Sequence, residues 1–294
     1  MLVRRVEDLL HLFRSLHLLR LILSLFILIG AVCMANGQYL TNNVLDRVKK
    51  IGVSGSTGTV FTMEVDGSQY LITAKHVITA LKGDNGEVEI FEGKGKSKKL
   101  KVKILRCPEP VDIAVLVPEI PITPTPPLSG VDGQMIMSQD MFFVGFPYGD
   151  DTLSTLMEET AIGFARKAMY SAQQVGDGWV LMYLDGTNNP GFSGGPVVYQ
   201  DMTLPEHPWK IAAVISGFRP DLSDVYSIEI IKAEQASDEE KAQARIVTFA
   251  DGRTGRLRPT GNVIRYNTGI VQAYGIQAAV KLIRAGNVKG PKVQ

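Results

Sequence analysis

The chain has 294 residues, of which 45% are apolar and 21% are charged, with 29 glycines and 15 prolines. This composition is that of a turn-rich globular protein and excludes a disordered or fibrous one. The formal net charge is +1, and the densest basic stretch, residues 94–103, reads as a solvated hairpin, so we expect no nucleic-acid partner.

The first 36 residues differ from the rest of the chain. Four arginines lie within residues 1–20 and precede an uncharged, apolar run from Leu21 to Ala35 that is 15 residues long. At about 1.5 Å per residue this run spans roughly 22 Å, which is less than a bilayer core of about 30 Å. Positive residues, a short apolar run and small residues at its end are typical of a secretory signal. We predict that residues 1–36 are a signal peptide or, if they are not cleaved, a membrane anchor.

This leader predicts an exported protein, either secreted or periplasmic, that contacts a membrane only through residues 1–36 if they are retained. Without the leader, 27 basic residues stand against 28 acidic ones, and Cys107 is the one cysteine that remains. A lone cysteine forms no internal disulfide, so the hydrophobic core must hold the fold. We expect Cys107 to be buried rather than reactive.

Short strand-like segments begin at residue 58. The segments 58–65 and 68–74 flank the dipeptide Asp66-Gly67, which is a strong hairpin signal. Further segments of this kind follow at 87–93, 99–106 and 112–118. Residues 118–130 then contain five prolines. Because proline cannot donate to a sheet ladder, we expect residues 121–130 to connect two halves of the protein.

The second half repeats the strand-like pattern at 141–147, 160–169, 179–186, 193–200 and 210–218. No helical pattern of ten residues separates these segments, which favours an all-β fold of two packed antiparallel β-barrels. The predicted domains are an N-terminal barrel over 37–120, the connector at 121–130 and a C-terminal barrel over 131–294. We expect a short exposed helix at 237–247, within an insertion at 221–262, and a C-terminal helix within 274–286 that packs on the second half.

The stretch "GFSGGPVV" at 191–198 presents Ser193 in a glycine-rich turn. A serine hydroxyl needs a base before it becomes a nucleophile at neutral pH, and histidine is the usual base. His11 and His17 lie in the leader, and His207 lies in a proline-flanked loop. His76 in "TAKHVI" comes where an apolar strand ends, so it is the candidate base, although a lone histidine of this kind is more often structural.

Asp112 begins the otherwise apolar segment "DIAVLVP". A carboxylate beside a buried strand is costly unless a charged or hydrogen-bonding group meets it. It is either a turn former or the group that orients the histidine of a catalytic triad. His76, Asp112 and Ser193 in this order, with the proline connector between the acid and the serine, form a much stronger signal together than any one of them does alone.

These three motifs resemble those of the trypsin/chymotrypsin-like serine proteases. "TAKHVI", "DIAVL" and "GFSGGPVV" are similar to the family's segments around its base, acid and nucleophile, and the resemblance covers roughly residues 45–285. "MFFVGFPYG" and the C-terminal residues are also similar to bacterial trypsin-like domains, including the protease domain of HtrA-type enzymes. The resemblance implies a trypsin-like pair of barrels with the active site between them.

The resemblance also implies roles for individual residues. Ser193 would be the nucleophile, His76 the general base and Asp112 the orienting acid of a serine endopeptidase that acts through an acyl-enzyme. The backbone N–H groups of Gly191 and Ser193 would form the oxyanion hole, and Ser216 would begin the strand that pairs with substrate. The implied partner is a protein or peptide substrate. No metal-ligand set or nucleotide motif is visible, and no cofactor is expected.

Two positions depart from the family pattern. Phe192 stands where Asp or Asn usually precedes the nucleophile, so an ion pair with a freshly cut N-terminus cannot form the oxyanion hole. Phe192 must instead pack in apolar surroundings. Thr187 falls at the base of the primary substrate pocket, and Asp185 is out of register with it. We therefore expect small or aliphatic residues to be preferred there.

Two other functions remain open. A peptide-binding module on the same fold, weakly active or inactive, is compatible with Phe192 and with the insertion at 221–262. An esterase of the α/β-hydrolase type matches the bare pattern Gly191-x-Ser193-x-Gly195, but such a fold requires a helix after the serine and the histidine last in the chain. The chain has neither, so we reject that fold.

Overall fold

The computed structural model describes residues 39–293, apart from residues 94, 124–125, 129, 131–134, 158–159, 205, 207 and 287. The chain divides into two units, Met1–Thr41 and Asn42–Gln294. The predicted leader at 1–36 lies outside the described residues. Among the residues that are described, no helix is long and apolar enough to cross a membrane.

A closed six-stranded barrel follows the short helix α2 (Asn42–Leu45). In order around the barrel, its strands are β1 (Val48–Val53), β2 (Ser56–Val65), β3 (Ser68–Thr73), β6 (Ala114–Pro118), β5 (Lys96–Arg106) and β4 (Asn85–Gly93). The predicted hairpin joins β2 to β3, where Asp66 and Gly67 have φ values of 50° and 72°. Positive φ at both central residues is the geometry that favours Asp-Gly in two-residue hairpins. Of the six strands, β1 is the one that the sequence pattern did not predict.

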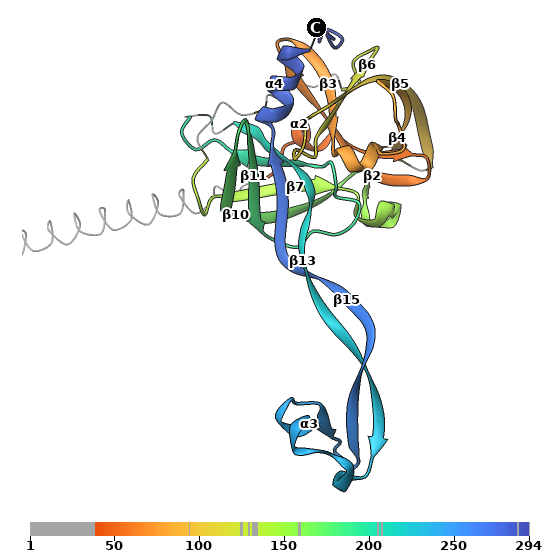
Figure 1. Cartoon of the computed structure of the whole chain (residues 1–294). Coiled ribbons are helices and arrows are strands. Elements are labelled where there is room, and N and C mark those ends of the chain that lie inside the picture. The colour runs from red at the N-terminus through yellow and green to blue at the C-terminus, as the bar shows by residue number, and fades with distance from the viewer. Residues whose placement is uncertain are drawn as a thin grey trace, which may run out of the picture. The chain divides into compact units, whose positions relative to one another are not determined.

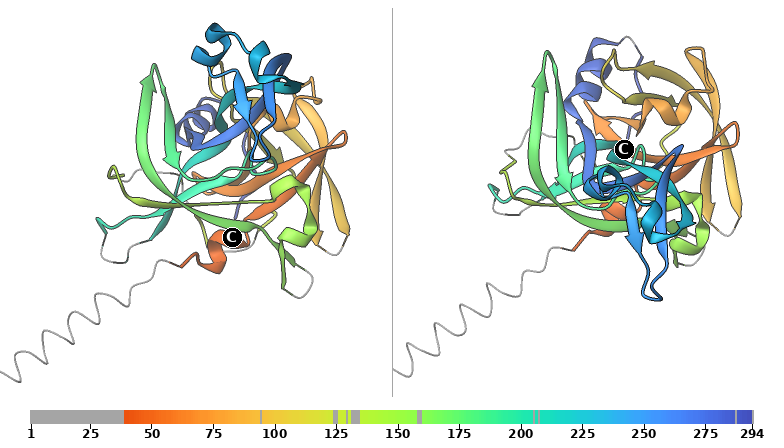
Figure 2. Two further views of the ribbon diagram at one scale, coloured as in Figure 1. Left: turned by 90° about the horizontal axis from the view of Figure 1, so that it is seen from below. Right: turned by 60° about the horizontal axis from the view of Figure 1, so that its bottom comes forward.

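A second ring of six antiparallel strands closes through the pairing of β11 with β15 (Figure 2). Around this ring the order is β11 (Trp179–Asp185), β10 (Phe164–Gly176), β7 (Asp140–Gly145), β12 (Pro196–Gln200), β13 (Trp209–Ile231) and β15 (Thr254–Gly275). A separate pair consists of β8 (Thr155–Met157) and β9 (Thr160–Ile162). The predicted fold, all-β with two antiparallel barrels, is confirmed.

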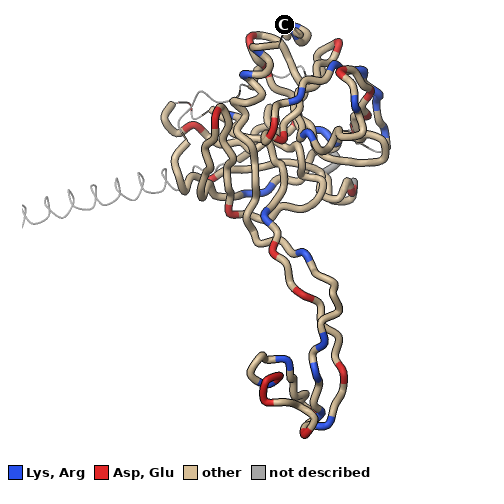
Figure 3. The backbone as a smooth tube through the Cα atoms, in the orientation of Figure 1, with Lys and Arg blue, Asp and Glu red and all other residues tan. Residues whose placement is uncertain are grey.

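Strands β13 and β15 are 23 and 22 residues long and continue far past the barrel as a two-stranded ribbon (Figure 1). The far end of the ribbon carries η4 (Ala233–Gln235), α3 (Asp238–Ala242) and β14 (Ile246–Thr248). Acidic and basic residues are interspersed along it (Figure 3). Helix α3 is the short exposed helix that we predicted, and Ser237 caps it by accepting the Glu240 N–H. The rest of the predicted insertion at 221–262 is therefore mostly paired strand.

The C-terminal helix α4 (Gln277–Ala285) is present, with Ile276, Ala279 and Ile283 buried. Our expectation that it packs on the second half was wrong, because its main contacts are with β5 and β6 of the first barrel, although the Ile276 N–H at its start donates to Ala212 O of β13. The chain after α4 explains this position. Gln69 N–H donates to the Pro291 carbonyl, and Ser68 forms a bridge with Lys292, so the C-terminal segment is tied to the first barrel.

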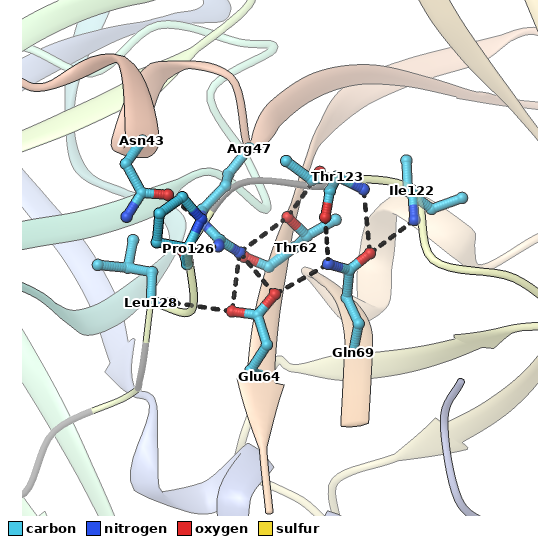
Figure 4. A network of polar contacts seen from close by, with 9 residues as sticks. All are labelled: Asn43, Arg47, Thr62, Glu64, Gln69, Ile122, Thr123, Pro126 and Leu128. Carbon is cyan, nitrogen blue, oxygen red and sulfur yellow. Dashed lines mark hydrogen bonds and ion pairs between the residues drawn. The ribbon is translucent and has the colours of Figure 1, made fainter. Parts of the chain in front are cut away.

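The connector is attached to the first barrel by a buried polar network (Figure 4). Arg47 and Glu64, whose side chains are 1% and 5% exposed, form an ion pair at 2.9 Å. Glu64 also accepts the Leu128 N–H and a Gln69 amide hydrogen, and Gln69 accepts the N–H groups of Ile122 and Thr123. In the described part of 121–130 no strand forms, and these side chains take the place of a ladder as backbone partners.

Replacing Glu64 with alanine is expected to destabilise the protein by about 3–5 kcal/mol, since it leaves Arg47 charged and buried without its partner. Glu87→Ala is the matched control, because its ion pair with Lys99 is solvent-exposed and such pairs contribute about 0–1 kcal/mol. Urea unfolding of both variants measures the difference. Equal unfolding midpoints for the two variants would contradict this role of the network.

Candidate active site

His76 and Asp112 are brought together by the pairing of β3 with β6. Thr73 lies opposite Ala114 in this pair, so the residues just after β3 meet those just before β6. His76 lies in the short helix η1 (Lys75–Ile78). Its Nδ1 is 2.6 Å from Asp112 Oδ2, and its backbone N–H donates to Asp112 Oδ1 at 3.0 Å. Both carboxylate oxygens are therefore directed at His76, whose ring is half exposed.

Asp112 receives a further hydrogen bond from the second barrel. Ser216 Oγ donates to Asp112 Oδ2 at 2.6 Å. Burial would raise the pKa of the Asp112 carboxyl, but the hydrogen bonds from His76 and Ser216 and the charge of His76 outweigh it and lower the pKa. Asp112 is therefore an anion at neutral pH, which is the state that can orient a histidine through Nδ1–H.

Ser193 approaches this pair from the turn before β12. Its hydroxyl donates to the Ser216 carbonyl at 3.4 Å, and no hydrogen bond joins it to His76 within the described residues. Ser216 therefore contacts Asp112 through its side chain and Ser193 through its backbone carbonyl. The structure brings His76, Asp112, Ser193 and Ser216 into one site, with the Ser193 hydroxyl bonded to the Ser216 carbonyl rather than to the base.

Two hydrogen bonds to backbone carbonyl groups fix the turn at 190–195. Pro190 O accepts the Tyr148 N–H at 2.6 Å, and Phe192 O accepts the Gly195 N–H at 2.8 Å. In a trans peptide the C=O and N–H point in opposite directions. The N–H groups of Gly191 and Ser193 therefore face away from these partners, and neither has an acceptor among the residues described. Two adjacent free donors beside Ser193 Oγ are what an oxyanion hole requires.

Position 191 requires glycine because there is no room for a side chain and because its φ is positive. Its φ is +99°, and an added Cβ would lie 2.2 Å from Phe146 O and 2.7 Å from Tyr148 N. Thr59 on β2 holds the same turn from the first barrel. Thr59 Oγ1 donates to Gly191 O at 2.7 Å, and Thr59 N–H donates to Ser193 O at 2.8 Å.

Phe192 is fully buried and packs edge-to-face against Phe143 and Phe164, with ring centroids 5.1 and 6.3 Å away. The Arg166 guanidinium lies 5.7 Å from the centre of the Phe192 ring. Phe192 thus has the apolar surroundings that we expected. An aromatic cluster with one cation above it occupies the place where the family's usual acidic residue would make an ion pair.

A chain of side-chain contacts runs from Arg166 to the turn at 190–195. Arg166 donates to Asn189 Oδ1 at 2.9 Å, and Asn189 Nδ2 donates to the Tyr148 hydroxyl at 2.9 Å. Tyr148 has a left-handed backbone, with φ 57°, and its N–H is the donor that fixes Pro190 O. We call Arg166, Asn189 and Tyr148 the turn clamp. Sequence reasoning missed all three members, as well as Thr59.

The other predicted positions are less informative. Thr187 is exposed, whereas its neighbour Asn188 is 2% exposed and its Oδ1 has no partner in the described structure. Cys107 is buried, as expected, and burial raises the pKa of its thiol to about 11 against the lowering effect of Lys75, which disfavours the reactive thiolate. His207 lies outside the described residues. No cluster with metal-ligand geometry occurs among those described.

Several solved structures share features of the chain's architecture. Rv3671c from M. tuberculosis H37Rv in an inactive form is 17% identical, with 74% of this chain and 83% of that chain covered and a TM-score of 0.42. The HtrA-type protease AlgW with tripeptide is 16% identical over 83% of this chain and 62% of its own, with a TM-score of 0.47. The MamO protease domain from Magnetospirillum magneticum is 14% identical, with coverages of 76% and 96% and a TM-score of 0.41.

No curated protein matches the chain. The family model described as a trypsin-like peptidase domain matches residues 56–204, which is half of the chain. This match includes His76, Asp112 and Ser193, together with the turn that carries Gly191. The predicted relationship to trypsin-like serine proteases is confirmed, and the chain belongs to the family of trypsin-like peptidase domains.

Proposed function

We propose that the protein is a serine endopeptidase in which His76, Asp112 and Ser193 form the catalytic triad. The observation that carries this proposal is the pair of hydrogen bonds that direct both oxygens of an ionised Asp112 at His76, with the Ser193 hydroxyl beside the same Ser216. If Asp112 served only to form a turn, it would not need two hydrogen bonds to a half-exposed histidine.

In the proposed reaction, Ser193 Oγ attacks the carbonyl carbon of a peptide bond while His76 Nε2 takes the hydroxyl proton. His76 then delivers this proton to the leaving amine as the C–N bond breaks, which leaves an acyl-enzyme. Water attacks the ester with His76 again as the base, and Ser193 regains its proton as the carboxylic acid leaves. Asp112 stays ionised throughout and keeps His76 in the Nδ1–H tautomer. Rotation of the Ser193 side chain from Ser216 O toward His76 must precede the first step.

The N–H groups of Gly191 and Ser193 would stabilise the oxyanion of both tetrahedral intermediates. Each such donor is worth about 2.7–4 kcal/mol in the transition state. The turn clamp supports this role, because Tyr148 N–H keeps Pro190 O directed away from the hole. Arg166 and Asn189 act as positioning residues, since they reach the reacting atoms only through Tyr148 and the turn.

Replacing Arg166 with methionine is expected to lower kcat about tenfold with little change in KM. The apolar stem would still cover Phe192, but the hydrogen bond to Asn189 would be lost, and a charged hydrogen bond contributes about 1.5–3 kcal/mol. Arg166→Lys should recover part of the rate. Lys167→Met is the control, because Lys167 is the exposed neighbour on the same strand. A rise in KM alone, or equal effects of both methionine variants, would contradict the positioning role.

The second candidate is a peptide-binding module that lacks hydrolytic activity. The hydrogen bond from the Ser193 hydroxyl to Ser216 O favours it, since a nucleophile bonded there is not bonded to its base. Apo sites often show catalytic hydrogen bonds that form only when substrate binds. We therefore place the endopeptidase first.

The family implies peptide or protein substrates, and Thr187 offers no carboxylate for a basic side chain, so we propose small or aliphatic residues at the primary pocket. Hydrolysis of an unfolded protein, read by mass spectrometry of the fragments, tests both points. Cleavage after such residues that is lost in Ser193→Ala supports the proposal, whereas binding without cleavage supports the second candidate. Export rests on the leader alone, and the N-terminal mass of protein recovered outside the cytoplasm tests it.

A further inference from the structure

The ribbon of β13 and β15 exposes an unusual share of the large apolar side chains. We call residues 221–266 the arm. Over most of its length the arm's two strands pair only with each other, because β12 ends its pairing with β13 at Val214 and β11 ends its pairing with β15 at Ile270. Of the 20 large apolar side chains that are exposed in the described chain, eight lie in the arm.

Five of these eight side chains gather on one face of the ribbon, whereas Ile264 and Tyr266 lie on the other face. Residues opposite each other in an antiparallel pair share a face, and alternate residues along a strand share it too. On β13 this face carries Leu222, Tyr226, Ile228 and Ile230, which are 42–60% exposed. Across from them on β15 it carries Leu257, Pro259 and Val263. We call these seven apolar residues the apolar face. The charged residues Asp224 and Arg265 lie on the same side of the ribbon, at its Leu222 end.

Over the distal half of the arm the opposite face is polar and is partly covered, although nearer the barrel it carries the exposed Ile264 and Tyr266. In the distal half, Glu229 lies opposite Arg256 and forms ion pairs with Arg256 and Arg258. Arg256 also forms an ion pair with Glu240 of α3 at 2.7 Å, so the α3 segment folds back on this side. An isolated two-stranded ribbon is marginally stable in water. Over this distal half, the apolar face is therefore the side that exposes large apolar side chains to solvent.

The charge of the arm limits what that partner can be. Residues 221–266 contain eight acidic and seven basic residues, and many of them are paired within the arm. Such a nearly neutral surface gives no electrostatic attraction to nucleic acid or to anionic lipid. It also gives no strong repulsion between two copies of the arm.

The apolar face has a hollow beside Tyr226, two residues before Ile228, and an exposed side chain at Ile230, two residues after it. Tyr226 and Leu257 line a hollow together with residues 243–245 of the arm's far end. Ile230, two residues beyond Ile228 on the same face, is 53% exposed. A two-fold axis through Ile228 would exchange position 226 for position 230, so each Ile230 would enter the hollow of the other copy. An interface with this reciprocity is the kind that closes a symmetric dimer.

We infer that the apolar face is a dimerisation surface, on which the arms of two copies of this chain pack face to face about a two-fold axis near Ile228. Five side chains that are about half exposed, at roughly 200 Å² each when fully exposed, offer about 500 Å² of apolar area per copy. With the polar rim this approaches the roughly 800 Å² per partner that a stable interface buries.

Cysteine cross-linking in the full chain tests this dimer. Facing sheets pack about 10 Å apart, which is too far for a direct disulfide, so the probe is a short bismaleimide. Ile228→Cys, in a chain with Cys33→Ser, is expected to give a covalent dimer at micromolar concentration. Ser227→Cys is the matched control, because it is the preceding residue on the opposite face, and it should give none.

A second variant tests the fit of the two arms. Adding Ile230→Asp to Ile228→Cys should abolish the cross-link, whereas adding Ser227→Asp should leave it unchanged. The proposal is overturned if Ile228→Cys links no better than Ser227→Cys, which would assign the apolar face to a different partner. It is equally overturned if the cross-link survives Ile230→Asp.

Discussion

If the proposed triad is correct, replacing His76 with alanine is expected to lower kcat/KM for peptide hydrolysis by roughly a million-fold, which is the effect of losing the base of a serine protease. The proposed acceptor of the Ser193 hydroxyl proton is then lost. The ring is half exposed, so its removal leaves the core of the first barrel in place. Steady-state hydrolysis of a peptide, with the urea unfolding midpoint measured in parallel, separates loss of chemistry from loss of fold.

Lys82→Met is the control for this variant, since Lys82 is exposed and lines the same surface depression as His76. It should retain nearly full activity. Asp112→Asn should fall between the two, with a loss of about 10⁴-fold, because the amide would favour the wrong tautomer of His76. Activity in His76→Ala above one hundredth of the wild-type value would remove His76 from the proposed mechanism.

Replacing Gly191 with alanine is expected to lower kcat by about 10²–10³-fold, which is the effect of losing one oxyanion donor. The new Cβ would collide with Phe146 O and Tyr148 N, so the turn must move and the hydrogen bond from Tyr148 to Pro190 must break. The substrate's KM should change little, because the oxyanion is present only in the transition state and in the intermediates. Comparison of kcat and KM on one peptide measures this.

Gly55→Ala is the matched control for Gly191→Ala. Gly55 also has a positive φ, +85°, but an added Cβ there would meet nothing within 4 Å. The two variants share the backbone strain, and Gly191→Ala alone has the collision. If Gly55→Ala lost as much activity as Gly191→Ala, general destabilisation would explain both and the oxyanion role of Gly191 would fail.

The sequence predicted the elements whose signals are local. The Asp66-Gly67 hairpin, the capped helix after Ser237 and most barrel strands follow from patterns within ten residues. The arm portions of β13 and β15, residues 221–231 and 254–266, were not predicted, because the whole far end of the arm separates these two paired segments along the chain. Leu222, Tyr226 and Ile228 do alternate with polar residues, but Pro220 and the intervening Ser and Asp residues disguised the strand. Helix α4 was placed on the wrong barrel, since its position depends on how the C-terminal segment pairs with Gln69.

The residues of the candidate site also fall into those with a local sequence signal and those without one. His76, Asp112 and Ser193 stand in motifs that can be recognised locally, and the structure brings them together. Arg166 and Tyr148 carry no such signal. Arg166 reads as one more charge on a strand, and nothing in the sequence predicts a left-handed backbone at Tyr148. The burial of Phe192 was foreseen because phenylalanine cannot replace an ion pair. Its aromatic and cationic neighbours come from β7 and β10, and only the fold reveals them.

Labelling of the purified protein with a fluorophosphonate, with the adduct located by mass spectrometry, tests the triad most directly. The probe phosphonylates a serine hydroxyl that a base has activated, and it needs no knowledge of the substrate. We expect one adduct, on Ser193, that is absent from both His76→Ala and Ser193→Ala. A folded protein that gives no adduct, or an adduct on Ser193 that persists in His76→Ala, would contradict the proposal that His76 activates Ser193.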